Sequence, residues 1–227
     1  MWRSLLLGAF VVLATGMVVI AHGYRINTAA RTLESTGAIQ LKGTLSHIAV
    51  VHGTDLVGDH TPLFLPNLKP DQTYSITITK DGYVAWHKDI RILSEQVASI
   101  GPIVMFQTKY QATATDAPDV ATLCQKNQPS ADAQLYRNGS ELRQSGTLIV
   151  RLSEDIRDSC WFNDHYHVAY ITEKSVRVVE KDGSNETTIF TSLDPLVHVA
   201  VARDNKTIYF STTNNKEMWF AITITAE

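Results

Sequence analysis

The residues most suited to chemistry are a thiol and two imidazoles that lie close together in the sequence. Cys160 is followed by His165 and His167, and a thiol beside an imidazole is the arrangement of a cysteine nucleophile. Strand residues two positions apart point to one face, so His165 and His167 could also bind Zn²⁺. The run Cys160-Trp161-Phe162 is more typical of a strand entering a core. The sequence therefore predicts no catalytic residue, no metal ligand and no cofactor-binding residue.

A group of three carboxylates is the second candidate. Glu154, Asp155 and Asp158 precede a predicted strand, and glycoside hydrolysis uses two carboxylates at a set separation. Acidic residues between strands are more often solvated turns. No Gly-x-Ser-x-Gly elbow and no Asp-x-Asp-x-Asp-Gly calcium loop occurs in the chain. The carboxylates and the two histidines support only an alternative function, an enzyme acting on glycan or peptide.

Composition excludes several classes of protein. The chain has 227 residues, with 20 Lys and Arg against 23 Asp and Glu, so its net charge of −3 gives no basic field for nucleic acid. Two cysteines are too few for a disulfide-rich miniprotein or a four-cysteine zinc site. Cys124 and Cys160 would pair only if the body lies in an oxidising compartment, and Cys124 falls in a segment without a strand pattern.

The N-terminal segment indicates how the chain is held. Residues 5–21, from Leu5 to Ala21, carry no charge, and at about 1.5 Å per residue they span roughly 25 Å as a helix. This pattern predicts a short tail at 1–4 and a single transmembrane anchor over 5–24. A signal peptide, cleaved or uncleaved, is the alternative reading of the same segment.

Residues 35–106 read as short strands with no helical period. Tyr74, Ile76 and Ile78 alternate with polar residues, and Asp81-Gly82 is a hairpin signal because glycine tolerates positive φ. Trp86 lies on the apolar face of the returning strand. The pattern predicts about five strands in a small antiparallel β-sandwich.

This stretch resembles a PEGA domain over about 70 residues. The motifs that carry the resemblance include, in order, Gly37, Gly53, Pro62, Tyr74, Gly82, Tyr83 and Trp86. The resemblance implies a bacterial, extracytoplasmic β-sandwich near a membrane, often followed by β-propeller-like repeats. The turn after Pro70 is longer than the family's pattern. Tyr83 and Trp86 could stack on a sugar, although packing of the hairpin explains them as well.

The rest of the chain is predicted as a linker over 107–133 and a propeller-like β region over 134–227. At an offset of 40, Val168 falls on Ile208 and Tyr170 on Phe210, which is the period of propeller blades. The region holds about two blades, whereas a closed propeller has at least four. A compact open packing, closure by self-association and shortening of a longer ancestor all remain open.

These observations predict a mainly β protein that is membrane-anchored, extracytoplasmic and non-catalytic, with a binding or scaffolding role in the cell envelope. The expected location is the cell membrane, with one span and the body outside the cytoplasm. The expected partners are the membrane and a cell-envelope polymer or surface protein, and not nucleic acid. Two alternatives are the envelope enzyme described above and a structural subunit that completes a propeller with another chain.

Overall fold

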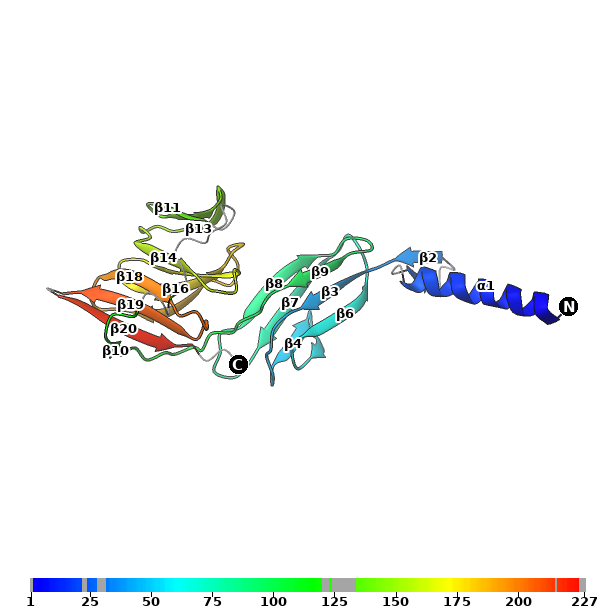
Figure 1. The fold of residues 1–227 in the computed structure, drawn as a ribbon, viewed down its shortest axis with the longest axis horizontal. Helices are drawn as coiled ribbons and strands as arrows, with labels where there is room; N and C mark the ends of the chain where they lie inside the picture. The colour runs from blue at the N-terminus through cyan, green and yellow to red at the C-terminus, as the bar shows by residue number, and fades with distance from the viewer. Residues whose placement is uncertain are drawn as a thin grey trace. The chain divides into compact units, whose positions relative to one another are not determined.

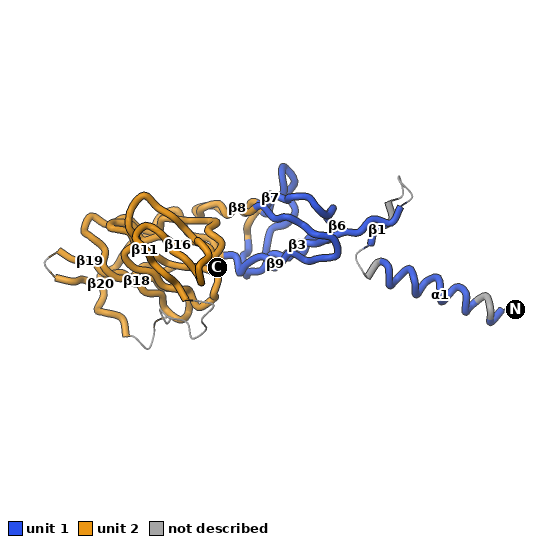
Figure 2. Tube along the Cα trace, turned by 90° about the horizontal axis from the view of Figure 1, so that it is seen from above, with its two compact units in different colours: residues 1–46, 50–76, 89–103 blue, residues 47–49, 77–88, 104–227 orange. Residues whose placement is uncertain are grey.

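The computed structural model describes residues 2–21, 24–27, 32–119, 123, 134–214 and 216–224. Within them the chain is mainly β, with 52% of residues in strands, one helix and several sheets that close no barrel. The mainly β fold is confirmed. The chain divides into two compact units, which Figure 2 colours separately. Unit 1 comprises residues 1–46, 50–76 and 89–103, and unit 2 comprises 47–49, 77–88 and 104–227.

The predicted anchor corresponds to helix α1, Trp2–Ala21. None of the described helical residues forms a segment long and apolar enough to pass through a bilayer, so the predicted transmembrane helix is not supported. The helix ends at Ala21, and Tyr24 instead begins strand β1, Tyr24–Asn27, which pairs with β2, Thr32–Ser35. The side chains of Leu5 and Ala21, the bounds given for the anchor, lie outside the described residues.

Two sheets account for the predicted sandwich. Their strands are β3 (Gly37–Leu41), β6 (Leu63–Leu68) and β9 (Val97–Ile100) in the first, and β4 (Ala49–His52), β5 (Asp55–Gly58), β7 (Thr73–Thr79) and β8 (Trp86–Arg91) in the second. Ile39 from the first sheet and Val50 and Ile76 from the second are fully buried, so the core of unit 1 lies between these strands. The structure corrects the antiparallel prediction at one pair, because β3 and β9 run parallel. Such a pair needs a long crossover connection, which the strands between them supply.

Unit 2 contains three further sheets (Figure 1). The first sheet consists of β11 (Leu135–Asn138), β12 (Glu141–Gln144) and β13 (Thr147–Arg151). The second consists of β14 (Asp158–Trp161), β15 (His167–Ile171), β16 (Ser175–Glu180) and β17 (Thr187–Thr191). The third consists of β18 (Leu196–Val201), β19 (Thr207–Thr213), β20 (Glu217–Thr223) and β10 (Thr113–Thr115).

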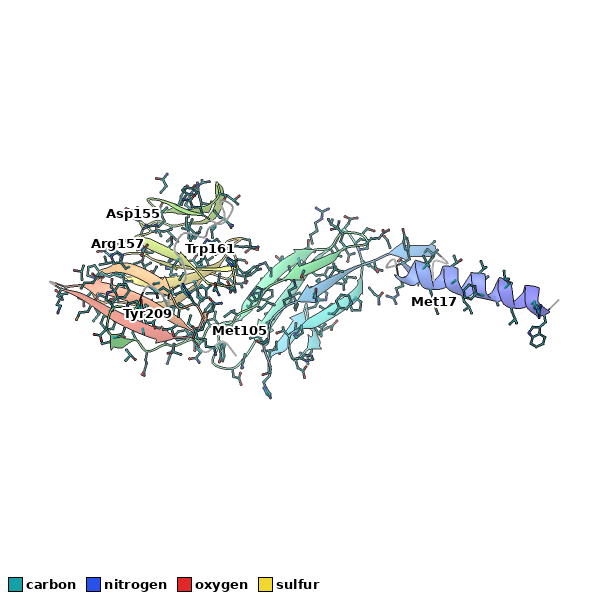
Figure 3. All side chains as sticks on the ribbon, in the orientation of Figure 1. Met17, Met105, Asp155, Arg157, Trp161 and Tyr209 are labelled. Atoms are coloured by element: carbon teal, nitrogen blue, oxygen red, sulfur yellow. The ribbon has the colours of Figure 1, made fainter. Side chains whose placement is uncertain are left out.

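The middle sheet is covered on both faces. Ala169 and Val178 pack with the third sheet, whereas Trp161 and Tyr170 pack with the first, and Figure 3 shows Trp161 on that side. All five residues of β15 are buried. Strands buried on both faces read as continuous apolar runs rather than as alternating ones, which explains the sequence of β15.

The predicted linker over 107–133 is not wholly irregular. β10 lies within it and pairs antiparallel with β20, where Thr115 faces Trp219, 104 positions later in the chain. Leu123 also forms an isolated bridge with Ala202. The three residues of β10, Thr113–Thr115, are too short a run to indicate a strand in the sequence. Their pairing depends on β20, which is distant in the chain.

The 40-residue repeat has a structural basis. In the β14–β15 pair Ser159 faces Tyr170, and in the β18–β19 pair Val199 faces Phe210, so the register of the two hairpins is the same at an offset of 40. The second sheet gains its fourth strand from β17, whereas the third gains it from β10.

The turns of these two hairpins also match. Asp164 and Asp204 each accept a hydrogen bond from the backbone N–H two positions later, at 2.9 and 2.8 Å. His165 and Asn205 then adopt left-handed φ values of 55° and 60°, which asparagine tolerates well and histidine less often. The Asn205 side chain accepts a hydrogen bond from the Asn163 N–H at 2.6 Å, so the two turns lie side by side.

Candidate functional site

A buried charge cluster in unit 2 is the most densely bonded polar group in the described residues. We call it the Glu180 cluster; its members are Trp86, Lys88, Tyr166, Glu180, Asp182, Ser184 and Asn185. The side chain of Glu180 is 1% exposed and that of Lys88 is 11% exposed. Burying charges of this kind costs several kcal/mol per ion unless they are paired and hydrogen-bonded.

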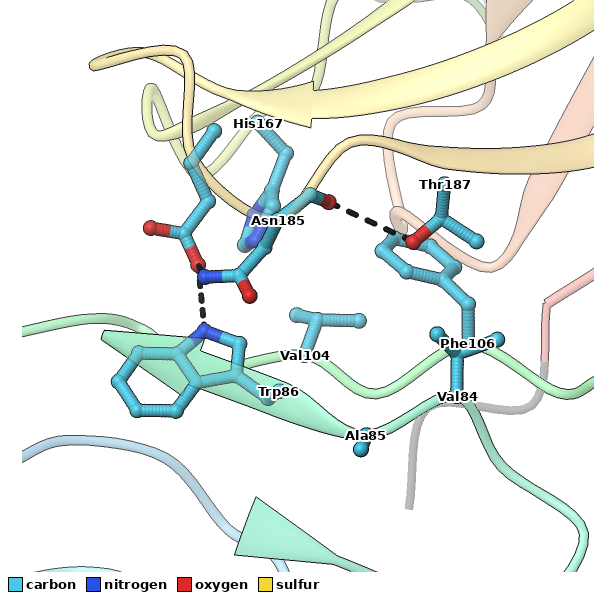
Figure 4. Close-up of a pocket in the computed structure, with 9 residues that line it drawn as sticks. Val84, Ala85, Trp86, Val104, Phe106, His167, Asn185 and Thr187 are labelled. Atoms are coloured by element: carbon cyan, nitrogen blue, oxygen red, sulfur yellow. Dashed lines mark hydrogen bonds between the residues drawn. The ribbon is translucent and has the colours of Figure 1, made fainter. Parts of the chain in front are cut away.

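The Glu180 carboxylate receives hydrogen bonds on both oxygens. The Trp86 indole N–H donates to Oε1 at 2.5 Å and the Asn185 amide donates to the same atom at 3.0 Å. Figure 4 labels Trp86 and Asn185 in this region. Lys88 and the Ser184 hydroxyl donate to Oε2, the latter at 3.0 Å. The carboxylate is thus fully satisfied by donors of the protein itself.

Two strands position these groups. Trp86 and Lys88 are two positions apart on β8, so both side chains point to the same face of the strand. Glu180 ends β16, and the following turn closes with a hydrogen bond from the Gly183 N–H to the Glu180 carbonyl at 2.9 Å. This tight turn returns Ser184 and Asn185 to the carboxylate.

Lys88 completes the cluster. Its ammonium donates to Glu180, to Asp182 at 2.8 Å and to the Tyr166 hydroxyl at 2.9 Å. Burial alone would lower the pKa of Lys88, but the hydrogen bonds to Asp182, Glu180 and Tyr166 outweigh burial, so the pKa is raised. Burial acts to raise the pKa of Asp182, but the hydrogen bonds from Lys88 and Ser184 lower it by more. The pKa of Asp182 is therefore below its ordinary value. Lys88 is charged at neutral pH.

Little space remains beside the cluster. The cavity there has a volume of about 10 Å³ and is lined by Val84, Ala85, Trp86, Val104, Phe106, His167, Glu180, Asn185 and Thr187 (Figure 4). That volume is about the room that one water molecule needs. A substrate therefore does not fit beside Glu180, and the geometry supports a structural role for the cluster.

We expect the thermal stability of the protein to fall at alkaline pH. Burial raises the pKa of Tyr166 to about 12 and that of Tyr110 to about 12, although hydrogen bonds oppose this at both. A group whose pKa is higher in the folded chain stabilises it fully below the unfolded pKa, which is about 10 for both tyrosine and lysine. As pH rises from about 10 to 12, the contributions of these tyrosines are lost and that of Lys88 declines, so we expect the melting temperature to fall over this interval.

The measurement is a thermal melt at a series of pH values, combined with tyrosinate absorbance. We expect at least two of the eight tyrosines to ionise only near pH 12 or on unfolding. In a Tyr166→Phe variant the late-titrating amplitude should shrink by one tyrosine. A melting temperature that stays constant from pH 9 to 12 would contradict the prediction.

The residues considered in the sequence as candidate nucleophile and metal ligands, Cys160, His165 and His167, have the following contacts. Cys160 is fully buried in the core shared by the second and third sheets. His167 is 2% exposed, and its Nδ1 lies 2.6 Å from the Asp164 carboxylate. Burial acts to raise the pKa of Asp164, but the hydrogen bonds from His167 lower it by more. The pKa of Asp164 is therefore below its ordinary value. His165 lies in the turn before β15, and the described residues hold no group of three metal-ligating side chains. Cys124 lies outside the described residues, so its pairing with Cys160 stays an open alternative.

The three carboxylates of the predicted acidic site have different surroundings. Glu154 is 3.1 Å from Arg177, at a side-chain exposure of 43%. Asp158 is buried and accepts a hydrogen bond from the Val199 N–H at 3.0 Å. Asp155 lies near Gly139, where a methyl group would come within 3.3 Å of its carboxylate. These contacts place the three carboxylates against different partners: Arg177, Gly139 and the Val199 N–H.

The positions that resemble a PEGA domain fall on strands and turns. Gly37 lies in β3, where a Cβ would come within 2.4 Å of Ile92. Gly53 has a φ of 61° between β4 and β5, and Pro62 follows a cis peptide bond. Tyr74 is buried on β7, and its hydroxyl accepts a hydrogen bond from the Lys69 N–H at 2.8 Å.

The other three of these positions belong to the hairpin tip in unit 2. Gly82 has a φ of 81°, and its carbonyl accepts a hydrogen bond from the Thr108 N–H at 2.9 Å. Tyr83 is half-buried and forms a β-bridge with Gln107. Trp86 is only 3% exposed, so its faces are not available to a sugar.

Sequence reasoning did not find the Glu180 cluster. Trp86 was assigned to the hairpin, but its partner Glu180 lies 94 positions away, and nothing local marks that carboxylate as buried. The one available signal was Glu180 directly after two valines at the end of β16, and most residues at strand ends are solvated.

A scan of known protein families finds no model that matches this chain, and a search of curated proteins finds no match either.

Proposed function

We propose that this protein is a non-catalytic binding or scaffolding protein of the cell envelope, attached to a membrane by helix α1, with its β units outside the cytoplasm. The observation that carries the proposal is the apolar surface of α1. The partner that we propose for the β units is a cell-envelope polymer or another surface protein.

The apolar surface surrounds the whole helix. Phe10, Val11, Val12 and Leu13 are consecutive, hence about 100° apart, and their exposed fractions are 70, 52, 72 and 65%. Met17, labelled in Figure 3, is 71% exposed. Moving one such side chain from water to an apolar phase gains about 1.5 to 3 kcal/mol. A helix that is apolar all round is stable only in an apolar environment, which a membrane provides.

The role of the β units is supported by two observations. The buried charges of the Glu180 cluster are satisfied within the protein and have no space for a substrate. The resemblance of residues 35–106 to a PEGA domain favours a body outside the cytoplasm. Both observations fit a protein that binds or spaces other components rather than one that transforms a substrate.

Membrane attachment can be tested by fractionation of cells that express the full chain. We expect the unaltered protein to sediment with membranes and to resist 1 M salt, a condition in which the Debye length is about 3 Å and electrostatic attachment fails. The double variant Phe10→Glu, Leu13→Glu should move to the soluble fraction, because it places two charges in the apolar segment. Thr15→Ser serves as the control and should stay with the membranes. Release of the unaltered protein by salt alone would refute attachment through α1.

A further inference from the structure

The outer face of the third sheet in unit 2 has an ordered pattern of small and aromatic residues. Phe210 and Ile222 pack into the core, so their neighbours along the strands point to the opposite face. On that face Tyr209 lies directly between Ala200 of β18 and Ala221 of β20. Tyr209 is half-buried, and both of its cross-strand neighbours have small side chains. Figure 3 labels Tyr209 on this sheet.

The next row of the same face is also aromatic. Ser211 lies between His198 and Trp219 in the register. The two rings are nearly parallel, 10° apart in orientation with their centroids 6.3 Å apart, and the Ser211 side chain is fully buried. Two further aromatic rings therefore lie one row away from Tyr209 on this face.

A hollow adjoins this surface. Its volume is about 410 Å³, within the range of small-molecule sites. Ala221, the neighbour of Tyr209, lines it together with Thr113 and Thr223 from the strands. The chain before β10 supplies the remaining wall, which consists of Gln107, Lys109, Tyr110 and Gln111.

The lining of the hollow is mostly polar. Among the described residues that line the hollow, two amides and the hydroxyls of two threonines and one tyrosine both donate and accept hydrogen bonds, none carries a carboxylate, and the exposed Lys109 supplies a positive charge. Aliphatic contact is limited to Ala221 and the methyl groups of the threonines. A protein partner requires large apolar anchors at the centre of its interface, which this hollow does not offer.

We propose that the hollow and the Tyr209 surface bind a saccharide chain that carries carboxylated sugars. A sugar ring packs its C–H face on the Tyr209 ring, its hydroxyl groups bond to Gln111 and Thr113, and a uronate carboxylate pairs with Lys109. This inference deepens the proposed function and rests on its claim that the β units bind an envelope polymer. It assigns the saccharide site to residues other than Tyr83 and Trp86.

The test is a titration of the full chain, purified in a zwitterionic detergent that has no sugar headgroup. The probes are a hyaluronan hexasaccharide, which alternates glucuronate with N-acetylglucosamine, and chitohexaose, which has N-acetylglucosamine alone. We expect binding of the hyaluronan probe, and Lys109→Gln should weaken it about tenfold, the loss of one charge-assisted hydrogen bond. Tyr209→Ser should weaken both probes by a similar factor.

Matched controls keep the test specific. Tyr136→Ser alters a 50% exposed tyrosine on another sheet of unit 2, and Lys174→Gln alters an exposed lysine between β15 and β16, so neither should change either affinity. The proposal is overturned if neither probe binds, if the controls weaken binding as much as Lys109→Gln and Tyr209→Ser, or if the face instead mediates self-association that Tyr209→Ser abolishes. Fractionation of the Tyr209→Ser variant tests membrane attachment separately. If this variant loses saccharide binding but still sediments with membranes, the saccharide site is tested independently of attachment through α1.

Discussion

Replacing Glu180 by glutamine lowers the free energy of unfolding by about 3 kcal/mol, because removing one partner of a buried ion pair leaves the other charge poorly compensated. Lys88 is 11% exposed and keeps only Asp182 as a charged partner in that variant. Urea denaturation followed by tryptophan fluorescence measures the change. Glu154→Gln is the matched control, since Glu154 pairs with Arg177 at 43% exposure and its loss should cost under about 1 kcal/mol.

A double variant separates the pair from its surroundings. Lys88→Met combined with Glu180→Leu removes both charges, and buried pairs replaced by apolar residues of similar volume are often neutral or stabilising. We therefore expect the double variant to be more stable than Glu180→Gln alone. If Glu180→Gln were as mild as Glu154→Gln, the cluster would not contribute to the stability of unit 2.

Substitution of Gly183 by alanine is the second large effect, with an expected loss of about 3 kcal/mol or more. Gly183 has a φ of 84°, which costs a residue with a Cβ roughly 1 to 2 kcal/mol. The added Cβ would also meet the Ile149 carbonyl oxygen at 2.4 Å, so backbone has to move, and overpacking of this kind costs typically about 1 to 3 kcal/mol. The loss can be measured as a shift of the urea midpoint.

Gly82 is a matched control that isolates the effect of the contact between an added Cβ at Gly183 and Ile149. It has nearly the same φ, 81°, and follows the same Lys-Asp dipeptide, yet a Cβ there would meet nothing within 4 Å. Gly82→Ala should therefore show only the conformational cost, about 1 to 2 kcal/mol. Equal losses at Gly82 and Gly183 would mean that the contact with Ile149 has no energetic weight.

These two glycines show how far a sequence predicts a fold. The turn at Asp81-Gly82 was predicted from local chemistry, and the same chemistry applies at Gly183, because positive φ depends on a single residue. The difference between them depends on Ile149, which comes from another sheet. Period and turn chemistry therefore predicted the mainly β fold and the 40-residue offset, whereas the stacking of the three sheets required contacts that no local pattern encodes.

The same limit applies to the sites. His165 and His167 are close in sequence, which suggests a shared site, yet His167 begins β15 and is buried against Asp164 of the preceding turn. The Glu180 cluster draws on three separate segments of the chain, at residues 86–88, 166 and 180–185, and the hollow beside Ala221 lies where β10 pairs with β20. Sites made by distant segments leave no spacing that a reader of the sequence could recognise.

The β10–β20 pair has a consequence for the order of folding. During synthesis β10 leaves the ribosome about a hundred residues before β20, so the third sheet stays incomplete while the second sheet, whose strands are consecutive, can already form. Closing so long a loop slows folding more than it lowers stability. Native-state hydrogen exchange should accordingly show the amides of β15 opening with the global unfolding and those at the β10 edge opening first.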